Sequence, residues 1–191
     1  MKNENNTLLV IGLGNVGKEY EGTRHNIGFE VADKVSEALD IRFSENKKLQ
    51  AEVAKKQSLV IAKPTTFMNR SGLSIAKLKD YYKVEMENVI VVSDDFNLEL
   101  GKVRVRYGGS PGGHNGLESV MSQIGGQFWR VRVGIGDIGD RKAEKFVLEK
   151  FNKSEQGEVS EVIDKATSYL VDLMSCGEIK NESINVGPCD K

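Results

Sequence analysis

Residues 7–39 read TLLVIGLGNVGKEYEGTRHNIGFEVADKVSEAL, and this stretch decides the fold. Its first six residues are leucine-rich and β-branched and end in glycine, which predicts a buried strand over 7–12. Apolar residues recur at helical spacing from Ile27 onward, which predicts a helix over about 26–39. The polar stretch between them, 13–25, is too long for a tight turn. It is therefore a candidate site loop at the carboxyl end of a strand.

The glycines of this loop, Gly12, Gly14 and Gly17, have the spacing of a dinucleotide-binding fingerprint. That fold requires a helix to begin at the glycines, so that its first amides contact the pyrophosphate. Here the residues after the glycines lack apolar periodicity, and the helix is expected to begin near Asn26. No acid stands at the end of a second strand at the required distance. A nucleotide-binding module is the weaker alternative, and titration with NAD or ATP would test it.

The rest of the chain alternates strand-like and helix-like segments. Further strands are predicted at residues 50–55, 58–62, 88–93, 102–107 and 128–135. Further helices are predicted from 69 or 71 to 82, over 115–124 and over 159–173, where Gly177 would stop the last one. No full helical crossover fits between the strand at 102–107 and its predecessor, so the sheet should be mixed. We predict an α/β fold, namely a single-domain three-layer sandwich with a mixed central β-sheet flanked by helices.

Length and composition fit one domain. The 191 residues, 39% of them hydrophobic, can bury one substantial core, and we predict a single domain over 1–191 with weakly ordered ends at 1–6 and 178–191. With 27 basic and 28 acidic residues the net charge is -1, which argues against unspecific attraction to nucleic acid or to anionic membranes. The apolar run at 8–11 is too short for a signal peptide or a membrane span. A cytoplasmic protein with reduced cysteines is expected.

The only two histidines, His25 and His114, are each followed by asparagine. An imidazole that titrates near neutrality, beside carboxamides that can hold a carbonyl group, suggests activation of water rather than metal binding. His25 would accept a proton from water, and a carboxylate would hold its imidazole in the required tautomer. Asparagine amides would donate to the carbonyl oxygen as charge develops there. Such a set supports hydrolysis of an ester or amide.

Polar groups of this kind occur in four loops that each follow a predicted strand. They are Asn15 with His25, Asn69, Asp94, and Asn115 with His114. Loops at the carboxyl ends of strands converge on one crevice in an open α/β sheet, so these groups should meet. Taken singly, each asparagine is more often a turn or helix-cap residue. No Gly-x-Ser-x-Gly elbow is present, and neither cysteine adjoins a histidine, so a covalent nucleophile is not favoured.

Longer motifs occur around these groups in a fixed order. They are GLGN-x-G-x-x-Y-x-x-TRHN-x-GF at 12–29, KPTTFMN-x-SG at 63–72, DD at 94–95 and GGHNGL at 112–117. Together they closely resemble the bacterial peptidyl-tRNA hydrolase family, with spacings preserved from residue 8 to about 151. The resemblance implies cleavage of the ester that joins a peptide to the 3′ ribose of tRNA. The reaction frees stalled chains and recycles the tRNA for translation.

The resemblance also implies roles for individual residues. His25 matches the family's general base, and Asp94 matches the acid that orients it. The residues that match those holding the peptide and the water are Asn15, Asn69 and Asn115. The residues that match those lining the cleft are Tyr20, Met68 and His114. The positions of Arg106 and Arg132 resemble a clamp on the tRNA 5′ phosphate. The resemblance further implies a monomer without metal or organic cofactor, acting on peptidyl-tRNA and not on membranes.

An RNA contact can also be argued from charge alone. Five basic residues and one acid, Glu118, lie between positions 102 and 132; the bases are Lys102, Arg104, Arg106, Arg130 and Arg132. Alternating positions on two strands would place the arginines on one surface, although two solvated strand faces are the ordinary alternative. A noncatalytic RNA-binding protein, resembling the plant chloroplast splicing factors derived from this family, would keep these strands. It need not keep His25, Asp94 and the three asparagines, so their joint presence favours the enzyme.

Overall fold

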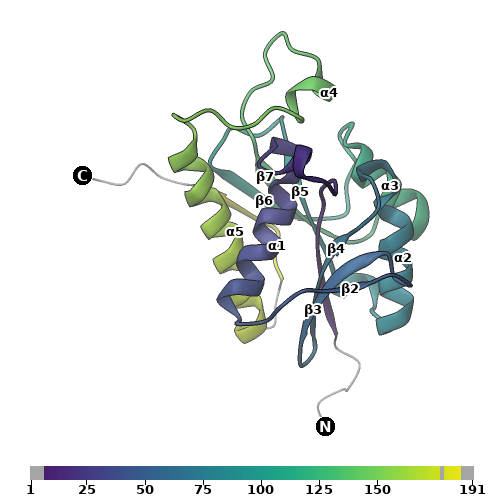
Figure 1. Cartoon of the computed structure of the whole chain (residues 1–191). Coiled ribbons are helices and arrows are strands. Elements are labelled where there is room, and N and C mark those ends of the chain that lie inside the picture. The colour runs from purple at the N-terminus through teal and green to yellow at the C-terminus, as the bar shows by residue number, and fades with distance from the viewer. Residues whose placement is uncertain (1–6, 177–178, 186–191) are drawn as a thin grey trace.

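The computed structural model describes residues 7–176 and 179–185, in which a mixed eight-stranded sheet lies between two layers of helices (Figure 1). The strand order is β2-β3-β4-β1-β5-β7-β6-β8. The strands are β1 (Leu8–Gly12), β2 (Ser44–Asn46), β3 (Ala51–Lys56), β4 (Leu59–Pro64), β5 (Val89–Asp95), β6 (Lys102–Tyr107), β7 (Trp129–Gly134) and β8 (Glu182–Asn185). The predicted three-layer α/β sandwich is confirmed.

Two pairs of helices cover the two faces of the sheet (Figure 1). On one face lie α1 (Ile27–Ala38) and α5 (Gln156–Cys176), and on the other lie α2 (Ser71–Tyr82) and α3 (Asn115–Ile124). Shorter helical turns are η1 (Lys18–Tyr20), η2 (Arg24–Asn26), η3 (Met68–Arg70), η4 (Met86–Asn88) and α4 (Ala143–Phe146). No helix among the described residues has the length and hydropathy to cross a bilayer.

The central strands are buried on both faces, which explains their continuous apolar sequences. Along β1, Val10 packs toward α1 and α5, whereas Leu9 and Ile11 pack toward α2 and α3. The sheet thus separates two apolar clusters of side chains. Burial on both sides fixes the register of β1, because a shift by one residue would exchange the two sets.

The carboxyl ends of the central strands meet at one edge of the sheet. Strands β4, β1, β5 and β7 are parallel neighbours, whereas β6 pairs antiparallel with β7. The predicted absence of a helical crossover before β6 is therefore confirmed. The parallel arrangement brings Gly12, Pro64 and Asp94 to the same edge, as a shared site requires.

Glycines allow the helix that follows the first loop to touch the strands. A Cβ on Gly12 would lie 2.1 Å from the carbonyl oxygen of Gly28, and a Cβ on Gly28 would lie 2.6 Å from the carbonyl oxygens of Leu13 and Val92. Helix α1 begins at Ile27, well after the glycine motif, as predicted. The motif therefore provides close packing of α1 on β1 and β5, and it does not form the helix start that a dinucleotide site needs.

Three short elements were not predicted. Strand β2 and helix α4 have three and four residues, which is too short for a periodic signal. Strand β8 pairs antiparallel with β6 at the sheet edge, and Ile184 packs against the apolar cluster on the α5 side. The predictions made for residues 1–6, for the end of the tail and for Cys189 fall outside the described residues.

Candidate active site

The central contact of the site joins His25 in η2 to Asp94 near the end of β5. Both side chains are buried, and Nδ1 of His25 lies 2.8 Å from Oδ1 of Asp94. An ionised carboxylate can only accept, so Nδ1–H of the imidazole is the donor. In the neutral ring, Nε2 then keeps its lone pair. Asp94 therefore selects the tautomer in which His25 can act as a base.

A second imidazole donates to the same carboxylate oxygen. Nε2 of His114 lies 2.9 Å from Oδ1 of Asp94. Nδ1 of His114 accepts the backbone N–H groups of Gly116 and Leu117, at 3.0 and 3.2 Å, and so caps the N-terminus of α3. Because Nδ1 accepts, the ring proton must be on Nε2. His114 thus fixes the start of α3 to Asp94, and its ring centroid lies 4.9 Å from that of His25.

The two histidines determine the charge of Asp94. Burial by itself would raise the pKa of this carboxyl group, but the electrostatic attraction and the hydrogen bonds of the His114 and His25 N–H groups outweigh burial and hold the pKa well below its ordinary value. Asp94 is therefore an anion throughout the neutral range. That negative charge can compensate the positive charge that appears on the His25 ring when Nε2 takes a proton.

The loop after β1 is locked in place by reciprocal hydrogen bonds. The backbone N–H of Asn15 donates to Oδ1 of Asn26, and Nδ2 of Asn26 donates to the carbonyl oxygen of Asn15, both at 2.9 Å. Oδ1 of Asn15 accepts the backbone N–H of Met68 at 2.9 Å. This bond uses the side-chain oxygen of Asn15 and leaves the Nδ2 donor for another group. Asn26 was not predicted as a site residue, although its place directly after His25 was the available signal.

Packing connects the loop after β4 with the start of α3. A Cβ on Gly116 would lie 2.5 Å from Sδ of Met68 and 2.9 Å from Cε1 of His114, so these three residues are in contact. Asn69 and Asn115 come directly after Met68 and His114 in the chain, and both are exposed. The structure thus brings together five predicted residues in one continuous set: Asn15, His25, Met68, Asp94 and His114.

The other predicted residues lie at the margin of this set. Asn69 and Asn115 are exposed to solvent, and their contact with substrate stays a prediction. Tyr20 is half-buried in η1, and its carbonyl oxygen accepts the backbone N–H and the hydroxyl of Thr23 at 3.1 and 2.7 Å. Within the described part of the chain, no hydrogen bond joins Tyr20 to the set around Asp94. Its predicted contact with substrate stays a prediction.

His114 reaches the site by a route that the sequence analysis did not predict. Strand β6 runs antiparallel to β7, so Tyr107 at its end pairs with Trp129 at the start of β7, far along the strands from Asp94. Residues 108–114 then return along β7. The returning segment passes so close to two arginines that a Cβ on Gly109 would lie 2.8 Å from Arg130 and a Cβ on Gly112 would lie 2.6 Å from Arg132. The expectation that His114 follows the carboxyl end of a parallel strand is therefore wrong.

The predicted common face of the arginines is confirmed, but their exposure differs. The register pairs Arg104 with Arg132 and Arg106 with Arg130, which places all four on one face of the β6–β7 pair. Arg130 is buried, and it donates to the carbonyl oxygens of Gly108 and Gly126. The prediction that Arg130 belongs to an RNA-binding face is therefore wrong, because its guanidinium is buried against the backbone of the glycine-rich segment, residues 108–113.

The two arginines of the predicted phosphate clamp have protein partners. Nε of Arg132 forms an ion pair with Oδ2 of Asp95 at 3.1 Å, and the side chain is 20% exposed. Arg106 is exposed, and its Nη1 donates to the carbonyl oxygen of Glu182 at 2.8 Å while Nη2 donates to Oγ of Ser183 at 3.2 Å. Arg106 is thus bonded to strand β8, which the sequence analysis did not predict.

Comparison with known proteins identifies the family. The family model described as peptidyl-tRNA hydrolase matches residues 9–186. The chain belongs to the peptidyl-tRNA hydrolase family. The peptidyl-tRNA hydrolase of Mycobacterium bovis is 47% identical over 176 residues, which cover 89% of this chain and 92% of the relative. That of Rickettsia bellii is 43% identical over 170 residues, covering 84% and 89%. The crystal structure of peptidyl-tRNA hydrolase from Acinetobacter baumannii superposes with a TM-score of 0.84 at 33% identity, covering 91% of this chain and 90% of the other.

Membership of the peptidyl-tRNA hydrolase family confirms the resemblance carried by the motifs. A cavity of about 470 Å³ adjoins the site at Asn15 and Asn26, and neither histidine lines it. Its lining includes Glu30, whose pKa is raised by burial and by the neighbouring charge of Asp33. The lining also includes the acids Glu21, Asp33 and Glu52 and one base, Lys63.

The Asp94 cluster also has the composition of a metal site. His25, Asp94 and His114 offer ligand atoms within 4.8 Å of one another. However, the ring nitrogens nearest the carboxylate carry the protons that they donate to Oδ1, and Nδ1 of His114 is occupied by Gly116 and Leu117. A cation would have to displace two hydrogen bonds from a buried anion. The geometry therefore favours hydrogen bonding among these three side chains over coordination of a metal ion.

Proposed function

We propose that this protein hydrolyses peptidyl-tRNA at the ester between the peptide and the 3′ ribose, with His25 as general base and Asp94 as the group that orients it. The observation that carries the proposal is the 2.8 Å hydrogen bond from Nδ1 of His25 to the ionised carboxylate of Asp94, in a chain that belongs to this family. That bond leaves the lone pair of Nε2 to accept a proton. Among the described side chains, no serine or cysteine is hydrogen-bonded to His25, and a base in that position acts most simply on water.

In the proposed reaction, Nε2 of His25 takes a proton from a water molecule whose oxygen attacks the ester carbonyl. Negative charge then develops on the carbonyl oxygen, and Nδ2 of Asn15 and the amides of Asn69 and Asn115 are the available donors to it. When the tetrahedral intermediate collapses, the bond to the ribose oxygen breaks. The imidazolium returns its proton to that oxygen. Free tRNA, free peptide and neutral His25 result.

The substrate class gives the first prediction. An N-acetylated aminoacyl-tRNA should be deacylated at least about tenfold faster than the same tRNA with a free amino group. The reason is that a site built to pair with a peptide group leaves polar groups unsatisfied when that group is replaced by an ammonium. Timed release of labelled amino acid from both forms measures this. Equal rates would show that the protein does not recognise the peptide group. Binding of tRNA without any release of amino acid would favour a noncatalytic RNA-binding protein.

We further propose that Arg106 and Arg132 bind the 5′ phosphate of the tRNA. Both arginines belong to one face of β6 and β7, and two guanidinium groups suit bidentate contact with phosphate. Arg106 would have to exchange its bonds to Glu182 and Ser183 for the phosphate oxygens. Strand β8 therefore competes with RNA for this side chain.

That competition predicts a gain in affinity when β8 is loosened. Ile184→Ser removes apolar packing under β8, so tRNA should bind about five times more tightly, since a net protein hydrogen bond is worth roughly 1 kcal/mol. The gain should disappear in the Arg106→Ala background. Filter binding at one fixed salt concentration measures all four proteins, and Ile179→Ser is the control because Ile179 packs on the same cluster outside β8. An equal gain with and without Arg106 would contradict the competition.

A further inference from the structure

Arg24, one residue before the histidine of the site, is a buried cation whose two terminal nitrogens both have partners. It is 2% exposed. Nη1 donates to the carbonyl oxygen of Ile135 at 2.8 Å, and Nη2 lies 3.0 and 2.8 Å from the two carboxylate oxygens of Glu155. The guanidinium also lies 4.6 and 4.5 Å from the ring centroids of Phe146 and Phe151. The forked, planar shape of arginine is needed for this set, and lysine cannot reproduce it.

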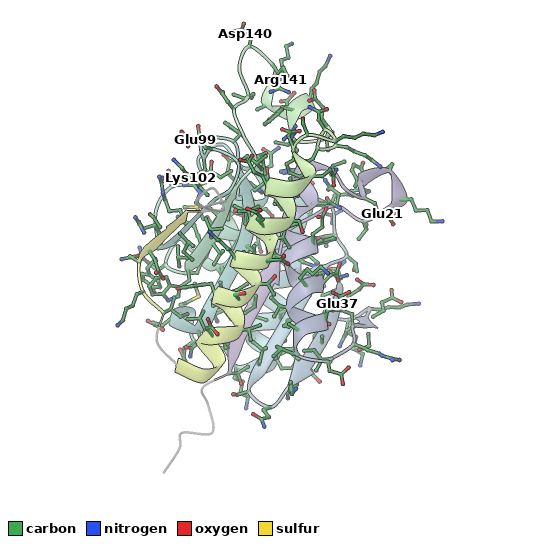
Figure 2. The ribbon with its side chains drawn as sticks, turned by 90° about the vertical axis from the view of Figure 1, so that its left-hand side faces the viewer. Glu21, Glu37, Glu99, Lys102, Asp140 and Arg141 are labelled. Carbon is green, nitrogen blue, oxygen red and sulfur yellow. The ribbon has the colours of Figure 1, made fainter. Side chains whose placement is uncertain are left out.

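All four partners belong to one stretch of chain, residues 135–155, which we call the arch. The arch connects β7 with α5, carries α4, and stands over the carboxyl ends of the central strands (Figure 1). Asp140 and Arg141 lie at its tip, away from the body of the protein (Figure 2). The base of the arch packs on the apolar cluster of the α1 and α5 side through Ile135, Phe146 and Phe151. Its polar attachment to η2 through Arg24 adds to that packing and joins the arch to the segment that carries His25.

The backbone of the arch also holds the backbone of η2. The N–H of Arg24 donates to the carbonyl oxygen of Glu149 at 3.0 Å, and the N–H of His25 donates to the carbonyl oxygen of Val147 at 2.8 Å. Thr23 and Lys150 form an isolated antiparallel bridge beside these bonds. The main chain of His25 is thus fixed by the arch, whereas its imidazole is fixed by Asp94 from the sheet. Both attachments together set the position of Nε2.

Charge makes the attachment through Arg24 strong. Burial of Glu155 works to raise the pKa of its carboxyl group, but the bonds from Arg24 and from the backbone of Asn152 outweigh it and hold the pKa below its ordinary value. Glu155 is therefore ionised at neutral pH. If that charge were removed, the buried guanidinium of Arg24 would lose its counter-ion, which is costly inside a protein.

We propose that Arg24 is a positioning residue which, through its pair with Glu155, holds the arch against η2 and so sets the reach of His25 Nε2 to the attacking water. The inference rests on the proposed function, because it concerns the same base. It explains why arginine is placed directly before the histidine, where its side chain points away from the substrate side into the arch. Small displacements of a general base have large effects on rate, since proton transfer needs hydrogen-bond distance.

The test compares two glutamate substitutions of the same chemistry. Glu155→Gln should lower kcat for N-acetylated aminoacyl-tRNA about tenfold and leave KM within about twofold, because binding groups stay in place while the base is misaligned. The control is Glu37→Gln on α1, which breaks an exposed 2.8 Å ion pair with Lys34 and should leave kcat and KM unchanged (Figure 2). Glu155 has a side chain 25% exposed, so its glutamine variant should fold.

Two further measurements separate positioning from general support of the fold. In Glu155→Gln, amide hydrogen exchange should accelerate at Arg24 and His25 but not at Val91 in β5. Arg24→Lys should lower kcat similarly, and the double variant should be no worse than either single one. Unchanged kcat in Glu155→Gln, or equal acceleration of exchange at Val91, would overturn the proposal. If the wild-type protein released no peptide, the proposed function would fail, while the exchange pattern would still decide whether Arg24 holds η2.

Discussion

Replacement of His25 by alanine should lower the rate of peptide release by about 10³-fold and leave tRNA binding within about twofold of the wild-type value. General-base catalysis contributes about 10²–10⁴-fold, and no second imidazole can replace His25 because both nitrogens of His114 are engaged. The fold should survive, since Asp94 keeps the hydrogen bond from His114. Single-turnover release of peptide and filter binding of the intact tRNA separate the two effects. Wild-type turnover in the variant would remove His25 from the mechanism.

The pH dependence of the same reaction provides the control for this variant. The pKa of Asp94 lies well below its ordinary value, so this carboxylate stays ionised when the pH falls from neutral to about 5. Any loss of rate in that range must come from a group that gains a proton, and an imidazole is the ordinary candidate. The wild-type rate should therefore fall on acidification. The residual rate of His25→Ala should not change over the same pH range. If the rate of the variant fell on acidification as steeply as the wild-type rate, a group other than His25 would be responsible for the fall.

The architecture was predictable where burial leaves a periodic pattern. Strands β1 and β5 are covered on both faces and read as short continuous apolar runs, and α1 has one apolar stripe. Strand β8 carries no such signal, because only Ile184 among its described side chains packs on the core and its pairing depends on the exposed edge of β6. Which strand lies at the edge of the sheet depends on how distant segments of the chain pack together. The local sequence therefore could not reveal that β8 pairs with β6.

The site was predictable in part for the same reason. The carboxyl ends of parallel strands share an edge, and this rule is sufficient to bring Asp94 to the loop that carries His25. His114 reaches the carboxylate by a different path, because residues 108–114 run back along β7 after an antiparallel strand. Its double role as cap of α3 and donor to Asp94 depends on where that helix begins in space. Spacing along the chain contains no such information.

The arginines show the limit of an alternation argument. Period-two spacing correctly placed Arg106 and Arg130 on one face, but it could not give their depth. The glycine segment covers Arg130, and β8 reaches Arg106 from the edge. Arg24 was read only as part of a family motif, because its partners lie more than 100 residues away along the chain. Depth and distant partners arise from packing between elements.

Replacement of Asp94 by asparagine should lower kcat by about 10²–10³-fold while KM changes little. Two imidazole N–H groups converge on one oxygen of Asp94, and a neutral amide is a weaker acceptor that also presents N–H donors. Without the anion, the tautomer of His25 is no longer selected, and the positive charge formed during proton transfer is not compensated. Steady-state kinetics with N-acetylated aminoacyl-tRNA measure the loss.

The neighbouring carboxylate gives a matched comparison. Asp95→Asn removes the partner of Arg132, so it should change the affinity for tRNA more than kcat. The two variants should also differ in stability against pH. A carboxyl group whose pKa is lowered by folding stabilises the protein above its unfolded-state pKa, and that contribution is lost as the pH falls toward the folded-state value. The deficit in melting temperature of Asp94→Asn should therefore be largest near neutrality and shrink in strong acid. A deficit independent of pH, together with wild-type kcat, would show that Asp94 neither orients His25 nor carries the charge assigned to it.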